Sequence, residues 1–315
     1  MRTAFMTGAT GFVGSHLASV LLSGGWRVKA VVRASSSPAR IPRGCAVERT
    51  GFDEPAALRS AMEGADAVFH IAGATSARCQ EEFDSANALV TRAVAGAWRD
   101  SAPSAPFMLV SSQSAAGPCG EGPLTPYGRS KLAAEAVLRR CDGEWVIIRP
   151  PAVFGPGDDA TSPIFRMALK GLFFSPSGSG SGFSLVYVKD LAALLACLPD
   201  NASARRVTLE PSYGRIIGWK EFRRALEVAA GRRLLHLVMP APMVVAAGFL
   251  SETAGALTGR CPVFDRHKSR EFLASGWTCN VEPVERLTGW KASTPLEEAL
   301  RETVEWARGA KRAGS

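Results

Sequence analysis

Short apolar runs alternate with amphipathic segments along the first half of the chain. The runs of strand length lie at residues 3–8, 26–33, 65–73, 105–112 and 144–150. The segments with apolar residues at three- and four-residue spacing lie at 14–25, 54–64, 83–100 and after Pro126. That spacing is typical of helices. Buried strands that alternate with helices predict an α/β fold built on a doubly wound parallel sheet.

The regular alternation ends near Pro150. We expect the apolar run 183–188 and the helix after it to return to the sheet, with Asp190 capping the N-terminus of that helix. The remainder reads as a smaller, mostly helical unit. The predicted division is therefore one domain of residues 1–155 with 183–198 returning to it, and a second of residues 156–182 and 199–315.

Composition adds few constraints to this picture. The 315 residues are 46% hydrophobic and 21% charged, which is ordinary for a soluble globular protein. The net charge of +8 comes from scattered arginines and lysines with no run of five, so no nucleic-acid partner is expected. Seven dispersed cysteines without a CxxC pair argue against a disulfide framework and a zinc site. They favour reduced thiols in a cytoplasmic protein.

Two segments bear on targeting and membranes. Met1 leads directly into an apparent strand, so no signal peptide is expected. The most apolar stretch, 234–250, is interrupted by His236, Pro240 and Pro242 and is short for a bilayer span. We interpret it as a buried helix or a pocket wall, and peripheral contact with a membrane is the less favoured alternative. No histidine has ligand-like neighbours, and no metal is assigned.

The sequence "TGATGFVG" (7–14) lies between the first strand and the first helix. Gly8 permits a tight turn, Gly11 lets the backbone approach a pyrophosphate, and Gly14 lets the helix pack closely on the strand. The helix N-terminus then presents free N–H groups to phosphates. The motif in this context predicts a dinucleotide site in a Rossmann domain.

The end of the second strand bears on the choice of dinucleotide. A carboxylate there would bind the ribose hydroxyl of NAD, but the chain has Arg33. A guanidinium suits a 2′-phosphate, so NADP(H) is favoured and NAD(H) remains the alternative. Arg40 or Arg43 could add a second contact, and a merely solvated Arg33 is the competing interpretation.

These motifs together resemble the extended branch of the short-chain dehydrogenase/reductase superfamily. That branch includes NAD(P)-dependent epimerases, dehydratases and 3β-hydroxysteroid-dehydrogenase-like reductases. The other matching stretches are "HIAG" (70–73), "SANALVTRAV" (85–94), "VSSQSAAGP" (110–118), "YGRSK" (127–131), "RPPAVFGPGD" (149–158), "FSLVYVKDLA" (183–192) and "GWTCNVEPVERLTGWKAST" (276–294). The resemblance implies a nicotinamide cofactor and a Ser/Tyr/Lys active site. Further cofactor contacts carried over from the family are Thr10, Phe12, Val13, Asp53, Ala72, Gly73, Lys131, Pro150 and Val153.

The catalytic residues that the resemblance implies are Ser112, Tyr127, Lys131 and Asn87. On a helix, Lys131 shares a face with Tyr127, and a close cation would favour the phenolate of a residue that exchanges a proton with substrate. Ser112, rather than Ser111 or Ser114, would bind the substrate oxygen, and Asn87 would support Lys131 through water. Structural alternatives are a strand-end cap for Ser112 and a surface position for Asn87.

Two departures from the family pattern affect the predicted function. Phe52 stands where an acidic residue near the adenine is common, which makes Asp53 an uncertain substitute. Phe183 stands where sugar-nucleotide epimerases carry a phosphate-binding arginine, which favours an uncharged, partly apolar substrate in contact with Ser112 and Phe183.

The expected function is therefore an NAD(P)-dependent oxidoreductase that interconverts a secondary alcohol and a ketone on a small molecule. A sugar-nucleotide epimerase or dehydratase with transient hydride transfer to bound NAD is the first alternative. A non-enzymatic scaffold is a weaker one, because the Tyr/Lys pair is intact. A homodimer is expected by analogy with relatives.

Overall fold

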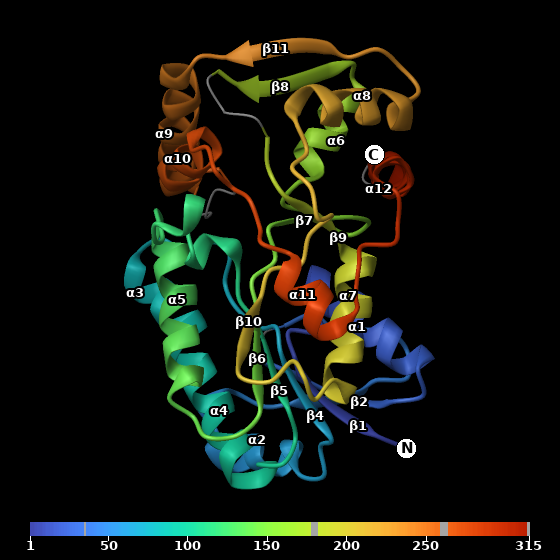
Figure 1. Cartoon of the computed structure of the whole chain (residues 1–315). Coiled ribbons are helices and arrows are strands. Elements are labelled where there is room, and N and C mark those ends of the chain that lie inside the picture. The colour runs from blue at the N-terminus through green and yellow to red at the C-terminus, as the bar shows by residue number, and fades with distance from the viewer. Residues whose placement is uncertain (35, 178–181, 259–263, 314–315) are drawn as a thin grey trace.

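Seven parallel strands form the central sheet, in the order β10-β6-β5-β4-β1-β2-β3 (Figure 1). The structure is a computed structural model that describes residues 1–34, 36–177, 182–258 and 264–313. The strands are β1 (Thr3–Thr7), β2 (Arg27–Val32), β3 (Ala46–Arg49), β4 (Ala67–His70), β5 (Phe107–Val110), β6 (Trp145–Ile148) and β10 (Val207–Leu209). The chain order reverses beside β1, which lies between β2 and β4. In such sheets ligands bind where the strand order reverses, at the carboxyl ends of the strands.

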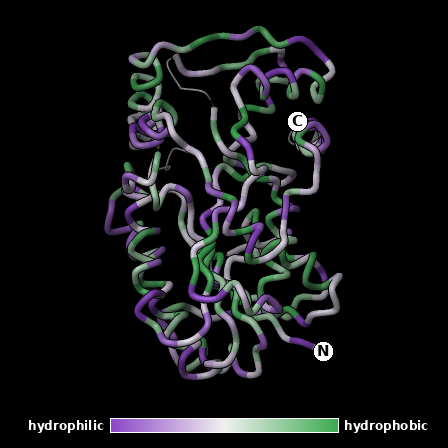
Figure 2. Tube along the Cα trace, in the orientation of Figure 1, coloured by the Kyte–Doolittle hydropathy of each residue, from purple (hydrophilic) through white to green (hydrophobic). Residues whose placement is uncertain are grey.

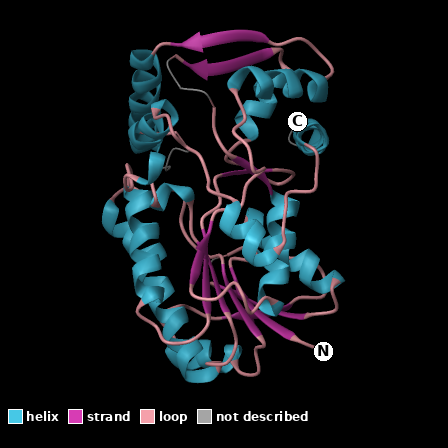
Figure 3. Ribbon diagram, viewed as in Figure 1, coloured by secondary structure: helices cyan, strands magenta, loops and turns pink. Residues whose placement is uncertain are grey.

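Helices cover both faces of the sheet (Figure 3). On one face, α1 (Phe12–Ser23) packs against α7 (Val188–Cys197), and residues such as Leu17 and Leu191 form a core with the strands. On the other face, α2 (Pro55–Met62), α4 (Val90–Ser101) and α5 (Pro126–Arg139) cover a second core that includes Trp98. Because both faces are covered, the inner strands carry continuous apolar runs instead of alternation. The predicted α/β doubly wound fold is confirmed.

The strands were predicted less well at the margins of the sheet. Residues 183–188 were expected to return to it, but β9 (Leu185–Tyr187) pairs with β7 (Ala152–Phe154) in a separate two-stranded sheet. The seventh strand of the main sheet is β10, from the segment predicted to be mostly helical. At three residues, β10 is too short to show a recognisable period. The division of the chain into domains stays a prediction.

The C-terminal region is mainly helical, as predicted. A third core joins α6 (Ser162–Leu169), α8 (Trp219–Ala230) and α12 (Leu296–Ala313), and Phe173 of β8 (Leu172–Pro176) packs into it. The other elements are α3 (Gln80–Asp84), β11 (Leu235–Met239), α9 (Ala241–Thr258), α10 (Arg266–Leu273) and α11 (Glu282–Thr288). Figure 1 places β8, β11 and α9 at the end of the molecule farthest from the N-terminus.

Asp190 has a different role from the predicted one. It lies inside the first turn of α7, whose flanking residue at the N-terminus is Tyr187. Its carboxylate instead accepts hydrogen bonds from the Ser293 and Thr294 hydroxyls, at 3.1 and 2.9 Å, and from the Thr294 amide. Asp190 therefore fastens the chain before α12 to the Rossmann domain, a contact over about a hundred residues that no local pattern reveals.

Candidate active site

The turn between β1 and α1 has no room for side chains at its glycines. Gly8 has a positive φ of 78°, and a Cβ there would lie 2.5 Å from the Ala72 amide nitrogen. A Cβ on Gly14 would lie 2.0 Å from the Gly8 carbonyl oxygen. Gly11 is the N-cap residue of α1, and no side chain caps the helix N–H groups. The turn thus leaves backbone donors open to an anion, which fits the pyrophosphate of a dinucleotide.

The other predicted cofactor residues follow the carboxyl ends of neighbouring strands. Because β1, β4 and β6 are parallel, the segments after them meet at one edge of the sheet. These residues are Thr10, Phe12 and Val13 after β1, Ala72 and Gly73 after β4, and Pro150 and Val153 after β6. Val153 packs against two of the hydrophobic cores. One edge of the sheet therefore brings this predicted set together.

A buried hydrogen-bonded chain connects this edge to Asn87. The Ala72 amide donates to Thr7 Oγ1 (3.2 Å), and Thr7 Oγ1 lies 2.6 Å from His70 Nδ1. His70 Nε2 lies 3.0 Å from Thr91 Oγ1, which donates to the Asn87 carbonyl at 2.7 Å. Burial, helped by the charge of Lys131, lowers the pKa of His70 to about 3. His70 is therefore a neutral structural link.

Tyr127 lies in the first turn of α5. Thr125 caps the helix by accepting a hydrogen bond from the Gly128 amide at 3.1 Å. A Cβ on Gly128 would lie 2.3 Å from the Ser114 carbonyl oxygen, so only glycine lets α5 approach this segment so closely. Ser112 lies beside the Tyr127 hydroxyl and acts to lower the pKa of the tyrosine. The Ser112 Oγ accepts a hydrogen bond from the Ser114 amide at 3.1 Å.

Lys131 lies one turn along the same helix and is buried. Its ammonium donates to the Val110 carbonyl at 2.9 Å. A Cβ on Gly73 would lie 2.5 Å from Asn87 Oδ1 and 3.2 Å from Lys131 Nζ, so these two atoms border the same space. Asn87 is 1% exposed, which rules out the surface position. Its Oδ1 accepts from the Ala74 amide.

Glu135, a further turn along α5, is a fully buried carboxylate that the sequence analysis did not single out. Arg149 donates to it from Nε and Nη2 at 2.8 and 2.7 Å, and Arg139 adds a bond of 2.8 Å. The Ser111 hydroxyl donates to Glu135 at 2.6 Å, so Ser111 and Ser112 have different roles. Burial lowers the pKa of Lys131 to about 8, while the charge of Glu135 acts to raise it.

The cation that acts most directly on Tyr127 is Lys268 of α10, not Lys131. Its ammonium lies 5.2 Å from the centre of the Tyr127 ring and 2.8 Å from Glu271 Oε2. Glu271 in turn accepts a 2.9 Å hydrogen bond from Thr125. Burial raises the pKa of Tyr127, and the Lys268 charge and the neighbouring Ser112 hydroxyl lower it only in part. The net direction is upward, opposite to the expected stabilisation of a phenolate.

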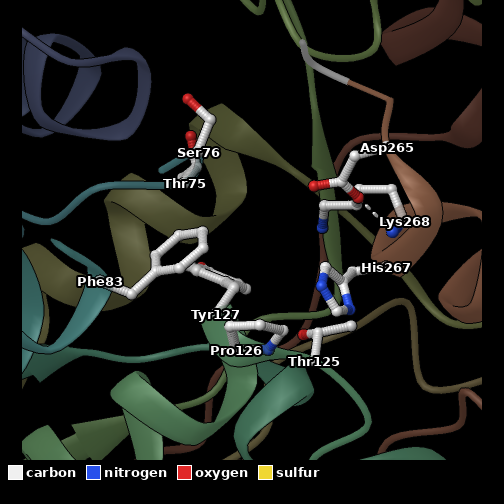
Figure 4. A pocket seen from close by; sticks show the side chains of 9 residues that line it. All are labelled: Thr75, Ser76, Phe83, Thr125, Pro126, Tyr127, Asp265, His267 and Lys268. Carbon is white, nitrogen blue, oxygen red and sulfur yellow. Dashed lines mark hydrogen bonds between the residues drawn. The ribbon is translucent and has the colours of Figure 1, made fainter. Parts of the chain in front are cut away.

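Tyr127 and Lys268 face a small cavity of about 20 Å³ (Figure 4). Phe83 lies over the tyrosine ring, at 6.0 Å between centroids, and Asp265 and His267 close the opposite side. Lys268 could not be predicted from the sequence, because α10 is more than a hundred residues from Tyr127 and carries no recognised motif. Neither the apolar run at residues 234–250 nor the basic helix α10 after it has a sequence pattern that predicts contact with α5.

Arg33 is exposed at the end of β2. Arg40 or Arg43 was expected to supply a second guanidinium group there, but the structure places Arg49 at the adjacent strand end. Arg49 pairs opposite Val32 and donates to the Ala34 carbonyl at 3.4 Å, so two guanidinium groups lie at adjacent strand ends. Arg40 is instead paired with Asp159 at 2.5 Å. Asp53 is exposed nearby, after β3.

Phe183 lies apart from this cavity, in an aromatic cluster of the C-terminal region. Its backbone pairs with Ile217, and its ring centroid lies 4.6 Å from that of Trp219 and 5.7 Å from that of Phe222. Trp219 also contacts Phe272 of α10 edge to face. The cluster therefore connects Phe183 to the helix that carries Lys268, without placing Phe183 beside Tyr127.

The fold and these motifs define an NAD(P)-dependent enzyme of the extended short-chain dehydrogenase/reductase type. Residues 4–208 match the NAD dependent epimerase/dehydratase family, and the chain belongs to that family. It is 32% identical over 306 residues to a ceramide reductase of Caulobacter vibrioides, with 97% of this chain and 94% of the relative covered. It is 27% identical over 345 residues to sterol demethylase protein B of Methylococcus capsulatus, at 97% and 98% coverage.

Solved structures agree on the fold. A UDP-glucose 4-epimerase of Thermotoga maritima, solved with UDP-glucose, superposes with a TM-score of 0.77 over 98% of this chain and 100% of that chain, at 18% identity. At this level of identity the likeness concerns the fold alone.

Proposed function

We propose that the protein is an NADP-dependent reductase that converts a ketone of a partly apolar, lipid-like substrate into a secondary alcohol. The observation that carries the proposal is the Ser112 hydroxyl beside that of Tyr127, with the buried Lys131 one helical turn away. Two hydroxyls placed together can hold one carbonyl oxygen and deliver a proton to it.

The raised pKa of Tyr127 supports the reductive direction. A phenol that stays protonated at neutral pH can donate its proton to the oxygen of a carbonyl as negative charge develops there. Ser112 orients that oxygen, and Lys268, 5.2 Å from the Tyr127 ring, supplies positive charge close to the proton donor. A bound nicotinamide would supply the hydride, held by the glycine turn, by the segments after β4 and β6 and by Lys131.

Arg33 and Arg49 support the preference for NADP. Both guanidinium groups are exposed at the carboxyl ends of β2 and β3, beside the reversal of strand order where a dinucleotide would bind. Two guanidinium groups favour a phosphate dianion over a neutral ribose hydroxyl.

The apolar character of the substrate has two supports. Phe183 occupies the position where sugar-nucleotide epimerases carry a phosphate-binding arginine, and it packs in an aromatic cluster that offers no charge to a substrate diphosphate. The relatives that match nearly all of the chain include proteins named for ceramide and sterol chemistry. We therefore expect long-chain or sterol-like ketones to be reduced, and UDP-sugars not to be epimerised.

Tyr127→Phe is the direct test, with Tyr213→Phe as the matched control. The Tyr213 hydroxyl is buried without a hydrogen-bond partner among the described residues, so its removal should be neutral. We expect NADPH oxidation with a panel of apolar ketones, lowered about a hundredfold or more in kcat by Tyr127→Phe alone. Unchanged activity in Tyr127→Phe would refute the assignment. Epimerisation of a UDP-sugar without net NADPH consumption would favour the alternative function.

A further inference from the structure

An exposed apolar surface lies on β11 and α9, at the far end of the molecule. Fourteen large hydrophobic side chains are exposed in the described part of the chain, and seven of them lie between residues 235 and 250. Their exposed fractions run from 38% to 67%. They are Leu235, Leu237, Val238, Met243, Val245, Phe249 and Leu250. We call this set the β11–α9 face, and Figure 2 shows the hydrophobic colour along much of it.

The local structure explains why these side chains are not part of a core. β11 pairs with β8 in a two-stranded sheet, so its other edge has no strand neighbour among the described residues of that sheet. A strand with one buried face should alternate in exposure, but four successive residues from Leu235 to Val238 are all exposed. In α9, Val244 is buried and Gly248 packs against the backbone of Asp265, while apolar residues elsewhere on the helix face outward. Helices that are apolar all round are normally covered on every side.

The surroundings of the β11–α9 face are basic. Arg232 and Arg233 precede β11, and Lys170 precedes β8, which starts in register with it. All three side chains belong to exposed residues, and Arg232 donates to the Leu169 carbonyl at 2.8 Å, at the same end of the two strands. The sequence has no aspartate or glutamate between residues 160 and 189 or between residues 228 and 251. The carboxylates that flank residues 228–251 in the sequence, Glu227 and Glu252, are paired with arginines.

We propose that the β11–α9 face binds the surface of an anionic phospholipid bilayer, with the apolar side chains entering the interface and the three cations meeting the lipid phosphates. Basic residues beside exposed apolar ones are the combination that such interfacial binding requires. The sequence alone argued against membrane contact, because it predicted that residues 234–250 would be buried. None of the described helices is long and apolar enough to cross a bilayer, so the proposed contact is peripheral.

A second copy of the chain is the competing occupant of this face. Its cations are not matched by free carboxylates in residues 228–251, so a self-association would bring uncompensated positive charges into one interface. An anionic bilayer supplies the opposite charge. The bilayer would also lie one helix away from the cavity, because α9 packs on α10, which carries Lys268.

The test is co-sedimentation of the full chain with vesicles, without substrate or cofactor, so that its outcome does not depend on the proposed reductase activity. We expect binding to vesicles of phosphatidylcholine mixed with phosphatidylglycerol, weakened by salt, and little binding to phosphatidylcholine alone. Val238→Asp should weaken the binding about tenfold or more, because it removes an inserting apolar side chain and adds a negative charge.

Matched controls separate this surface from general effects. Val47→Asp makes the same change on β3, the outer strand of the main sheet, where Val47 is 41% exposed against 55% for Val238. Arg233→Gln should weaken binding about fivefold, and Arg27→Gln, at the start of β2, should not. Thermal melts verify that each variant is folded.

Three results would overturn the proposal. The first is absence of wild-type binding to anionic vesicles. The second is equal loss of binding in Val238→Asp and Val47→Asp. The third is a vesicle-free dimer, seen by sedimentation equilibrium and dissociated by Val238→Asp, which would assign the face to contact between copies.

Discussion

Removal of the buried charge of Glu135 should affect both the fold and the titration of Lys131. Glu135 is fully buried and holds Arg149, whose side chain is only 16% exposed. In Glu135→Gln the amide keeps the shape of the carboxylate but leaves Arg149 without its charged partner at 2.7 Å. The remaining carboxylate near Arg149 is that of Glu210, at 4.0 Å.

The expected cost follows from burial. Breaking a buried ion pair by neutralising one partner typically costs about 3–5 kcal/mol, and the amide can still accept one of the hydrogen bonds, so we expect about 3 kcal/mol. For a chain of this size that loss corresponds to a fall in Tm of roughly 4–5 °C. The Glu135 charge also raises the pKa of Lys131, so its removal should move that pKa below its value of about 8.

Differential scanning calorimetry and the pH profile of kcat measure the two effects. If Lys131 must be charged, activity falls as pH rises through its pKa, and this basic limb should move to lower pH in Glu135→Gln. The matched control is Glu282→Gln, which removes an exposed pair with Arg286 and should cost less than about 1 kcal/mol. A Glu135→Gln protein as stable as Glu282→Gln, with an unmoved basic limb, would refute the reasoning.

Further predictions concern the other groups of the site. Lys268→Gln should raise the pKa of Tyr127 further, seen as tyrosinate absorbance appearing at higher pH; an unchanged titration would remove Lys268 from its surroundings. Gly14→Ala should destabilise the protein and abolish protection by NADP(H) in thermal melts, because a Cβ would meet the Gly8 carbonyl at 2.0 Å. Arg33→Asp should shift the ratio of NADPH to NADH activity toward NADH, and an unchanged ratio would contradict the 2′-phosphate assignment. His70 has a pKa of about 3 when folded against 6.5 ordinarily, so the unfolded chain binds its proton first. The free energy of unfolding should therefore fall as pH drops from 6.5 toward 3, less steeply in His70→Gln.

Local geometry made much of the candidate site predictable. The glycine turn is fixed by steric limits on neighbouring residues, and Tyr127 and Lys131 share a helix face because they are four residues apart. Ser112 could be chosen over Ser111 from its motif position, and the structure gives the physical difference, since the Ser111 hydroxyl is directed to Glu135. The sequence could not decide whether Asn87 lies on the surface or in the site. That choice depends on how deeply the residue is buried, which local sequence does not encode.

The sequence by itself determined the alternation of buried strands and helices, the dinucleotide turn and the spacing of the Tyr/Lys pair, because these depend on periodicity and on contacts within one or two elements. Only the tertiary structure decided which cation faces Tyr127, how Asp190 anchors residues 293–294, and that most of the large apolar residues between 235 and 250 are exposed. Each depends on packing between segments distant in the chain. Apolar residues in a strand look the same in sequence whether a neighbour covers them or not, and only the packed fold shows that β11 is left open.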